Sequence, residues 1–183
     1  MLLKDYTESN TRGIAGLSNQ LCNKAVGLGF LVHVAHPNLI TDSNSLVHLY
    51  LQPRSAAALL RVAARCKVQI STAYRTLAQQ YVLKHNLTTL VAPIGRSDHG
   101  SGRSVDVVNY SDIIGILRDE GWQETYASDL VHFDYPGTDQ RSNTILTFQH
   151  LWNDRNFNDR LDLDGVCGPH TLECLANSPI SGW

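Results

Sequence analysis

The chain has 183 residues, 43% hydrophobic and 17% charged, a length that predicts one domain or one domain with a small additional module. Fifteen lysines and arginines against 17 aspartates and glutamates leave a formal net charge of −2, which argues against the broad basic surface of a nucleic-acid-binding protein. The longest apolar stretch, around residues 27–34, is far shorter than the roughly 20 residues that span a bilayer, so no membrane span is expected.

The start of the chain and its cysteines bear on its cellular compartment. The first residues contain no basic segment leading into an apolar one, so no secretory signal is predicted. The four cysteines are too sparse for a disulfide scaffold and have no C-x-x-C spacing for structural zinc. Buried free thiols are the favoured interpretation, and a bridge between Cys167 and Cys174 stays open. The other two cysteines are Cys22 and Cys66.

The first third of the chain predicts two helices and a pair of strands. Apolar residues recur three or four apart over residues 13–29, which predicts a helix with one buried face. Runs rich in Val, Leu and aromatic residues over 30–34 and 45–51 predict two paired strands. Pro53 suits the first turn of a helix, and strong helix formers behind it continue the helix over 56–66.

The middle of the chain alternates strand, helix and loop. A strand is expected over 67–71 and a helix over 76–86. Proline, glycine and serine residues predict a loop over 88–103, and a Val-rich strand follows over 104–109. Ser111 is predicted to be the N-cap of the next helix.

That helix is expected over 112–120, with Gly121 as its C-terminal stop. Strands are predicted over 122–126 and 130–135, and the turn-rich residues 136–139 are the expected domain boundary.

The residues beyond this boundary predict a short helical segment. An amphipathic helix is expected over 144–153, and a last helix begins near Pro169 and continues through Leu175. The division is therefore a main domain of residues 1–137 and a small segment of residues 142–183.

An imidazole and a carboxylate stand close together in the segment Ser-x-His-x-x-Gly-x-x-x-Asp, residues 97–106. His99 lies in a glycine-rich stretch, and Asp106 lies within the Val-rich strand. An ionised carboxylate in a buried strand needs a partner, and a metal ion is one such partner. The glycines allow the loop to fold back so that His99 reaches the same point as Asp106.

A second candidate segment, Asp-x-x-His-Phe-Asp-Tyr, begins at Asp129. Along a strand, Val131, Phe133 and Tyr135 alternate onto one face, and the two polar residues between them, the histidine and the second aspartate, lie on the other. Asp129 has the opposite parity to that histidine. It therefore shares the site only if it lies in the turn before the strand.

Together these residues form a standard ligand set for catalytic zinc. The set is two histidines and one carboxylate, His99, His132 and Asp106, with the fourth position left for water. Zinc lowers the pKa of that water, and a nearby carboxylate accepts its proton, which makes Asp129 the candidate base. Arg75 is expected at a strand-to-helix corner. It either forms an exposed ion pair on the surface or binds a substrate carboxylate through two of its guanidinium nitrogens.

Three segments resemble the zinc D-alanyl-D-alanine carboxypeptidase family, which includes the VanY and VanX peptidases and the L-alanyl-D-glutamate endopeptidases of some phage endolysins. They are Ser-x-x-Tyr-Arg-Thr at 71–76, the His-x6-Asp segment at 97–106, and Asp-x-x-His-Phe at 129–133. Their order and spacing agree with the family, and the resemblance covers roughly residues 45–136.

The resemblance implies roles for individual residues. It implies that Arg75 holds a substrate carboxylate or stabilises the developing oxyanion, and that Ser97 helps to position the substrate. The same resemblance implies Zn²⁺ on the two histidines and Asp106, with Asp129 as general base. Many carboxypeptidases of the family have Glu at this last position, and Arg103-Ser104 replaces a small apolar residue, so the substrate is left open.

The family fold implied is α+β: a small antiparallel sheet that carries the zinc, flanked by helices, as in the Hedgehog signalling domain. The tail, with Asp-Gly-x-x-Gly-x-x-Thr at 164–171, is similar to a shortened peptidoglycan-binding module. A structural helical hairpin that binds nothing is the alternative for residues 142–183.

The expected function is zinc-dependent hydrolysis of a bond in the stem peptide of bacterial peptidoglycan, either D-Ala-D-Ala or L-Ala-D-Glu. The expected location is outside the cytoplasm or at the cell wall, by an unknown route. A non-catalytic, zinc-containing wall-binding protein is the main alternative, because a fold does not fix a function. A cytoplasmic dipeptidase is a third hypothesis that fits the missing signal.

Overall fold

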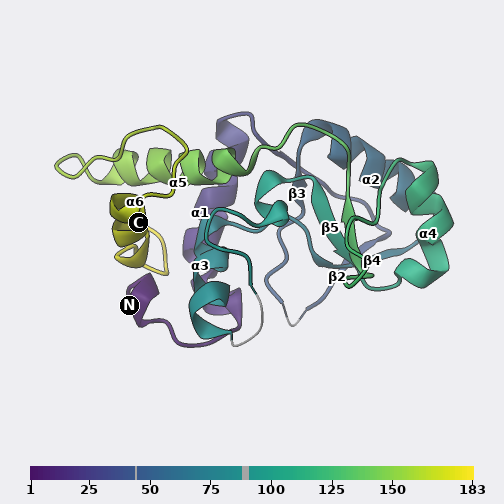
Figure 1. The fold of residues 1–183 in the computed structure, drawn as a ribbon, viewed down its shortest axis with the longest axis horizontal. Coiled ribbons are helices and arrows are strands. Elements are labelled where there is room, and N and C mark those ends of the chain that lie inside the picture. Colours follow the sequence, from purple (N-terminus) through teal and green to yellow (C-terminus); the bar gives the residue numbers. More distant parts are fainter. Residues whose placement is uncertain (44, 88–90) are drawn as a thin grey trace.

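The fold, a computed structural model, is described for residues 1–43, 45–87 and 91–183. It has two parts along its long axis (Figure 1). One half contains the sheet and two helices, and the other half is a group of helices that includes both chain ends. In chain order the elements are η1 (Leu3–Asp5), η2 (Thr11–Ile14), α1 (Ala15–Gly27), β1 (Val32–His33), β2 (Leu39–Thr41), β3 (Tyr50–Leu51), α2 (Pro53–Arg65), β4 (Val68–Thr72), α3 (Leu77–Asn86), η3 (Asp98–Ser101), β5 (Ser104–Val107), α4 (Tyr110–Asp119), β6 (His132–Asp134), α5 (Arg141–Arg155) and α6 (Pro169–Ala176).

The main sheet has four strands in the order β2-β4-β5-β6. The pairs β4–β5 and β5–β6 are antiparallel, whereas β2 runs parallel to β4. The class is α+β, as predicted, but the sheet is mixed because of β2, a strand that the sequence did not predict. Parallel pairing needs a long crossover connection, and the segment with α2 supplies it. The predicted pairing of segments 30–34 and 45–51 is confirmed, but only β1 and β3 form ladder pairs.

The first hydrophobic core lies between the sheet and helices α2 and α4. Leu59 and Val62 of α2 meet Val105 and Phe133 of the sheet, and all four side chains are fully buried. Because side chains alternate along a strand, the buried apolar face of β5 and β6 leaves Asp106 and the polar residues of β6 on the opposite face.

The second core joins both ends of the chain. Leu17 of α1 and Leu77 of α3 share it with Phe148 of α5 and Leu175 of α6. The amide of Leu3 also donates to a carbonyl near the C-terminus, over 2.9 Å. The segment 142–183 therefore packs directly on helices from the first half of the chain, and the division into two domains stays a prediction.

All six expected helices are present, and two other predicted features are wrong. Ser111 is not an N-cap, because the helix begins at Tyr110 after Asn109. The Asn109 side chain instead bonds the backbone of the neighbouring β4 segment, so sheet pairing sets this helix start. Residues 122–126 form no strand, since only Gln123 makes an isolated bridge.

The helices, one loop and the cysteines can also be compared with the expectations. The six expected helical segments correspond to α1 to α6, with Pro53 in the first turn of α2. The expected loop over 88–103 contains the short helix η3, and its residues 88–90 lie outside the described part. All four cysteines are free thiols, so the bridge between Cys167 and Cys174 is not formed.

Thr76 is the clearest local determinant of a helix start. Its Oγ1 accepts from the amide of Gln79 over 3.2 Å, and the Gln79 side chain accepts from the Thr76 amide over 3.1 Å, a complete capping box. We expect Thr76→Ala to lower the free energy of unfolding by about 1–2 kcal/mol, measured by urea denaturation. Ser111→Ala is the matched control and is expected to change it by less than about 0.5 kcal/mol. Equal effects of the two substitutions would contradict this assignment.

Candidate metal centre

A glycine turn brings His99 over the sheet. His99 lies in η3, and the chain then turns through Gly102, whose φ of 71° is in the left-handed region. A Cβ at Gly102 would also lie 2.3 Å from a methyl group of Leu31, so a larger residue does not fit there. The turn leads directly into β5, which carries Asp106. The predicted folding back of the loop is therefore confirmed.

Three donor groups converge at this point. In the antiparallel register of β5 and β6, Asp106 lies opposite His132. Asp106 Oδ1 lies 3.1 Å from His132 Nδ1 and 3.3 Å from His99 Nε2. The two imidazole rings are nearly perpendicular, with centroids 4.9 Å apart. The three residues that the sequence placed in one site are thus brought together.

The other nitrogen of each imidazole faces an oxygen behind the cluster. His99 Nδ1 lies 3.0 Å from the carbonyl oxygen of Ala73, and His132 Nε2 lies 3.4 Å from Asp134 Oδ1. A carbonyl or carboxylate oxygen only accepts, so each outward oxygen favours a proton on the nitrogen that faces it. The inward nitrogens, which face Asp106, are then the ones that would bind a metal ion once any proton on them is displaced, as around metal-ligating histidines.

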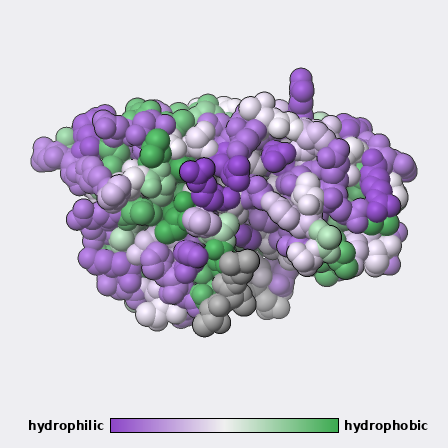
Figure 2. Space-filling view, in the orientation of Figure 1, coloured by the Kyte–Doolittle hydropathy of each residue, from purple (hydrophilic) through white to green (hydrophobic). Residues whose placement is uncertain are grey.

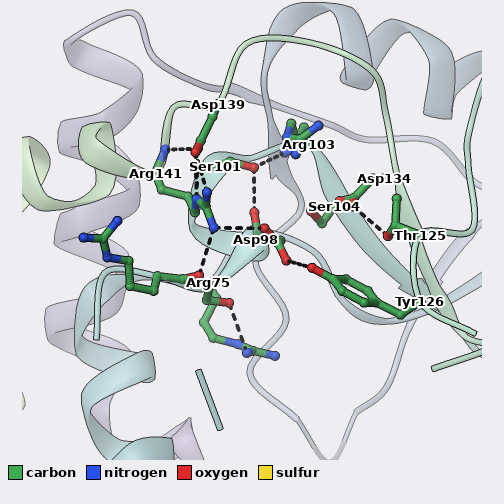
Figure 3. A network of polar contacts seen from close by, with 12 residues as sticks. Arg75, Asp98, Ser101, Arg103, Ser104, Thr125, Tyr126, Asp134, Asp139 and Arg141 are labelled. Carbon is green, nitrogen blue, oxygen red and sulfur yellow. Dashed lines mark hydrogen bonds and ion pairs between the residues drawn. The ribbon is translucent and has the colours of Figure 1, made fainter. Parts of the chain in front are cut away.

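Asp134 is itself held in place by two hydroxyl groups (Figure 3). The hydroxyl of Ser104 donates to its Oδ1, and the hydroxyl of Thr125 donates to Oδ2 over 2.8 Å. The sequence analysis placed Asp134 on the same strand face as His132 but gave it no role. The available signal was strand parity. Residues two apart on a strand point to the same face, so Asp134 shares the face of His132.

Charge is concentrated in this buried cluster. Burial disfavours the ionised form of Asp106, but hydrogen bonds from His132 and His99 outweigh it and hold the pKa of Asp106 well below its usual range. Burial likewise lowers the pKa of His132, but hydrogen bonds to Asp106 and Asp134 and their charges raise it to about 9. A cation at this position is therefore strongly favoured.

The donor set fits a divalent metal ion. Two imidazole nitrogens and one carboxylate oxygen are typical of zinc sites with an open position, and their ligand distances of about 2.0–2.2 Å imply neighbouring donors about 3.3–3.5 Å apart. The donor atoms around Asp106 Oδ1 lie close to this spacing. The cluster of His99, Asp106 and His132 could thus hold a metal ion.

Asp129 lies in the turn before β6, the position that the strand parity requires. Its backbone carbonyl accepts from the amide of His132 over 3.2 Å, which ties the turn to the cluster. The side chain is exposed, and within residues 1–43, 45–87 and 91–183 its carboxylate makes no hydrogen bond or ion pair. Its position agrees with the expectation, and its role as a base stays a prediction.

Arg75 and Ser97 lie together beside the cluster. Arg75 Nη1 donates to Ser97 Oγ over 3.3 Å and to Gln80 Oε1 over 3.4 Å, and its backbone amide donates to the carbonyl of His99. Burial lowers the pKa of the guanidinium, and the charge of Asp106 partly offsets this. In the described part of the chain Arg75 forms no ion pair at hydrogen-bond distance, so the alternative of surface pairing is not observed.

Tyr126 is a second residue that sequence analysis missed. Its ring packs against His132 with centroids 5.3 Å apart, and its hydroxyl donates to Asp98 Oδ2 over 2.7 Å. Asp98 Oδ1 in turn lies 3.4 Å from Arg141 Nη1 at the start of α5 (Figure 3). The C-terminal segment is thereby connected to the loop that carries His99. Since Tyr126 lies in a stretch predicted to be a strand, the sequence offered no signal for this contact.

No protein-family model matches this chain, and neither a curated protein nor a solved structure matches it. Among the helices of the described residues, none has the length and apolar character needed to cross a membrane. The function is therefore inferred from the metal cluster and the groups around it.

Asp134 is expected to tune the cluster without binding the metal ion. Asp134→Asn removes the negative charge behind His132 while keeping the shape of the side chain, so zinc affinity should fall about tenfold to a hundredfold. Titration against a chromophoric chelator measures this. Asp112→Asn, an exposed carboxylate on α4, is the control that should leave the affinity unchanged. Equal affinities of both variants would rule out the role of Asp134.

The charge state of His132 predicts pH-dependent metal binding. In chelator-treated protein its pKa is raised from 6.5 to about 9, so the imidazolium stabilises the fold fully below pH about 6.5, and this contribution is lost as pH rises through about 9. A metal ion must displace that proton. Zinc affinity should therefore rise with pH across this range, and calorimetry at pH 7.5 in buffers of different ionisation enthalpy should detect proton release. Binding without proton release would contradict the assignment.

Proposed function

We propose that this chain is a zinc-dependent peptidase that hydrolyses a bond in the stem peptide of bacterial peptidoglycan, as a D-Ala-D-Ala carboxypeptidase or an L-Ala-D-Glu endopeptidase. The observation that carries the proposal is the convergence of His99, Asp106 and His132, each imidazole oriented by an oxygen behind it. These are the residues at the metal positions of the family that the sequence resembles. The site chemistry and the sequence motifs thus favour the same reaction.

The arrangement of the sheet supports the family fold, which remains part of the proposal. Strands β4, β5 and β6 are antiparallel, and β5 and β6 carry two of the three cluster residues. Helices α2 and α4 cover the opposite face. A zinc site on the open face of a small sheet with helices behind it is the architecture that the resemblance implies for the D,D-peptidases and the Hedgehog domain.

In this proposal the protein's own groups divide the chemistry between them. His99, Asp106 and His132 would hold the zinc ion, which would supply a water of lowered pKa and polarise the scissile carbonyl. Asp129, in the turn beside His132, takes the proton from the attacking water and gives it to the leaving amine. Its exposed carboxylate can reach an incoming peptide, since nothing in the described structure holds it elsewhere.

Arg75 and Ser97 are proposed to hold the substrate. The guanidinium keeps its charge without a carboxylate partner at hydrogen-bond distance, and it lines a cavity of about 360 Å³ together with Ser71 and Thr72. A substrate carboxylate would take the acceptor place that Ser97 Oγ now occupies at 3.3 Å. Such pairing with a carboxylate is strong because both partners are charged. None of His99, Asp106 and His132 lines this cavity, so it would receive only the part of the peptide that Arg75 holds.

The C-terminal segment is proposed to bring the enzyme to the wall, which would place the protein outside the cytoplasm. Asp164 Oδ1 accepts from the side chain of Gln149 and from the amide of Val166, so the Asp-Gly loop fastens α5 to the approach of α6. Phe157 and Val166 in this connection are exposed. Figure 2 shows a mainly hydrophilic face with hydrophobic patches on both halves, including the half that contains α5 and α6.

One observation favours the alternative of a non-catalytic wall-binding protein. The Asp129 carboxylate has no contact that orients it toward the cluster in the described structure, whereas catalytic bases are usually fixed by neighbours. Against this, apo sites often tighten only around substrate. The same experiment separates the two functions.

The test is mass spectrometry of muropeptides and intact sacculi incubated with zinc-loaded protein and with a chelator-treated control. Chelator-sensitive loss of terminal D-Ala identifies a carboxypeptidase, and cleavage after L-Ala identifies an endopeptidase. Asp129→Ala should keep zinc and lose activity by about 10²–10⁴-fold, whereas His132→Ala should lose both. Full activity of either variant would refute the assignment. Binding of sacculi by zinc-loaded protein without any product would establish the alternative.

A further inference from the structure

A second group of metal-ligating side chains lies in the C-terminal segment. His170 and Cys174 are four residues apart on α6, so they share one face of the helix. Asp159, in the connection that follows α5, lies between them. Its Oδ1 is 2.9 Å from His170 Nε2, and its Oδ2 is 3.8 Å from Cys174 Sγ. One carboxylate thus spans an imidazole and a thiol.

This group is held in place by contacts outside it. The indole nitrogen of Trp152 donates to the backbone carbonyl of Asp159 over 2.6 Å, which fixes that residue against α5. Cys174 is 2% exposed and belongs to the second hydrophobic core, whereas the side chains of Asp159 and His170 are each 55% exposed. The group therefore has a rigid, buried sulfur on its inner side and an opening to solvent on its outer side.

The donor chemistry matches a transition metal. All three ligand atoms lie within 4.8 Å of one another. Zinc–ligand distances of about 2.3 Å to sulfur and 2.0–2.2 Å to nitrogen and oxygen give neighbouring donors about 3.3–3.7 Å apart, so small movements would seat an ion. Thiolate and imidazole select zinc and similar ions over magnesium or calcium.

The same carboxylate contacts both other side chains of the group. The Cys174 thiol donates to Asp159 Oδ2 over 3.8 Å, while Asp159 Oδ1 lies 2.9 Å from His170 Nε2. A divalent cation would replace the thiol proton and bring the sulfur, the carboxylate and the imidazole nitrogen onto one centre.

We propose that Asp159, His170 and Cys174 bind a second transition-metal ion, of the zinc class, which fastens the connection after α5 to α6. On binding, the Cys174 thiol loses its proton to solvent and a metal–sulfur bond forms, while the exposed side of the ion keeps water. The site is separate from the first cluster, since α6 and β5 lie in opposite halves of the molecule (Figure 1). It does not depend on peptidase activity.

Cobalt(II) distinguishes the two sites, because only the second contains sulfur. Metal-free protein titrated with Co²⁺ should bind two ions per chain and develop a thiolate-to-cobalt charge-transfer band in the near ultraviolet. His99→Ala should lose one ion and keep the band. Cys174→Ser and His170→Ala should each lose one ion and the band. Cys66→Ser, at the thiol directly after α2 in the other half of the molecule, should lose neither.

The proposal is overturned if the wild-type protein shows no charge-transfer band at saturating Co²⁺, or if the band survives in Cys174→Ser or His170→Ala. Because Cys174 is buried, its replacement carries a risk of unfolding, which circular dichroism detects. His170 is exposed, so His170→Ala leaves the core intact and decides the question in that case.

Discussion

The buried carboxylate of Asp106 is the constraint around which this half of the molecule is arranged. An ionised group in a strand that packs on a hydrophobic core costs several kcal/mol unless cations or hydrogen-bond donors surround it. Here the compensation comes from imidazoles on both sides, His99 from a loop and His132 from the adjacent strand. The sheet register and the glycine turn are both needed to place them, so the site depends on the folded sheet.

The groups behind the cluster set its chemistry. Asp134 and the carbonyl of Ala73 each face the outward nitrogen of one imidazole, which leaves the inward nitrogens directed at the same point. Around them a chain of polar contacts runs from Tyr126 through Asp98 to Arg141 at the start of α5. The C-terminal helices thus support the loop that carries His99, in addition to closing the second core.

Local sequence signals were sufficient where the interaction itself is local. The capping box at Thr76 and the proline at the start of α2 involve residues a few positions apart, so their helices were predicted well. Local sequence signals gave the wrong prediction where a residue distant in the chain determines the local structure. Asn109 bonds the neighbouring strand segment and moves the helix start away from Ser111, and β2 is a strand only because β4 offers it a parallel edge.

The sequence by itself determined the ligand types and their spacing, because His-x6-Asp and the strand parity around His132 are properties of adjacent positions. Periodicities that need no partner predicted the helices, and the family resemblance implied the α+β class. Only the tertiary structure decided which nitrogen of each imidazole faces inward, that Asp134 stands behind one of them, and that Asp159 meets the thiol on α6. Those relations depend on distances between segments remote in the chain, which folding sets by packing whole elements against one another.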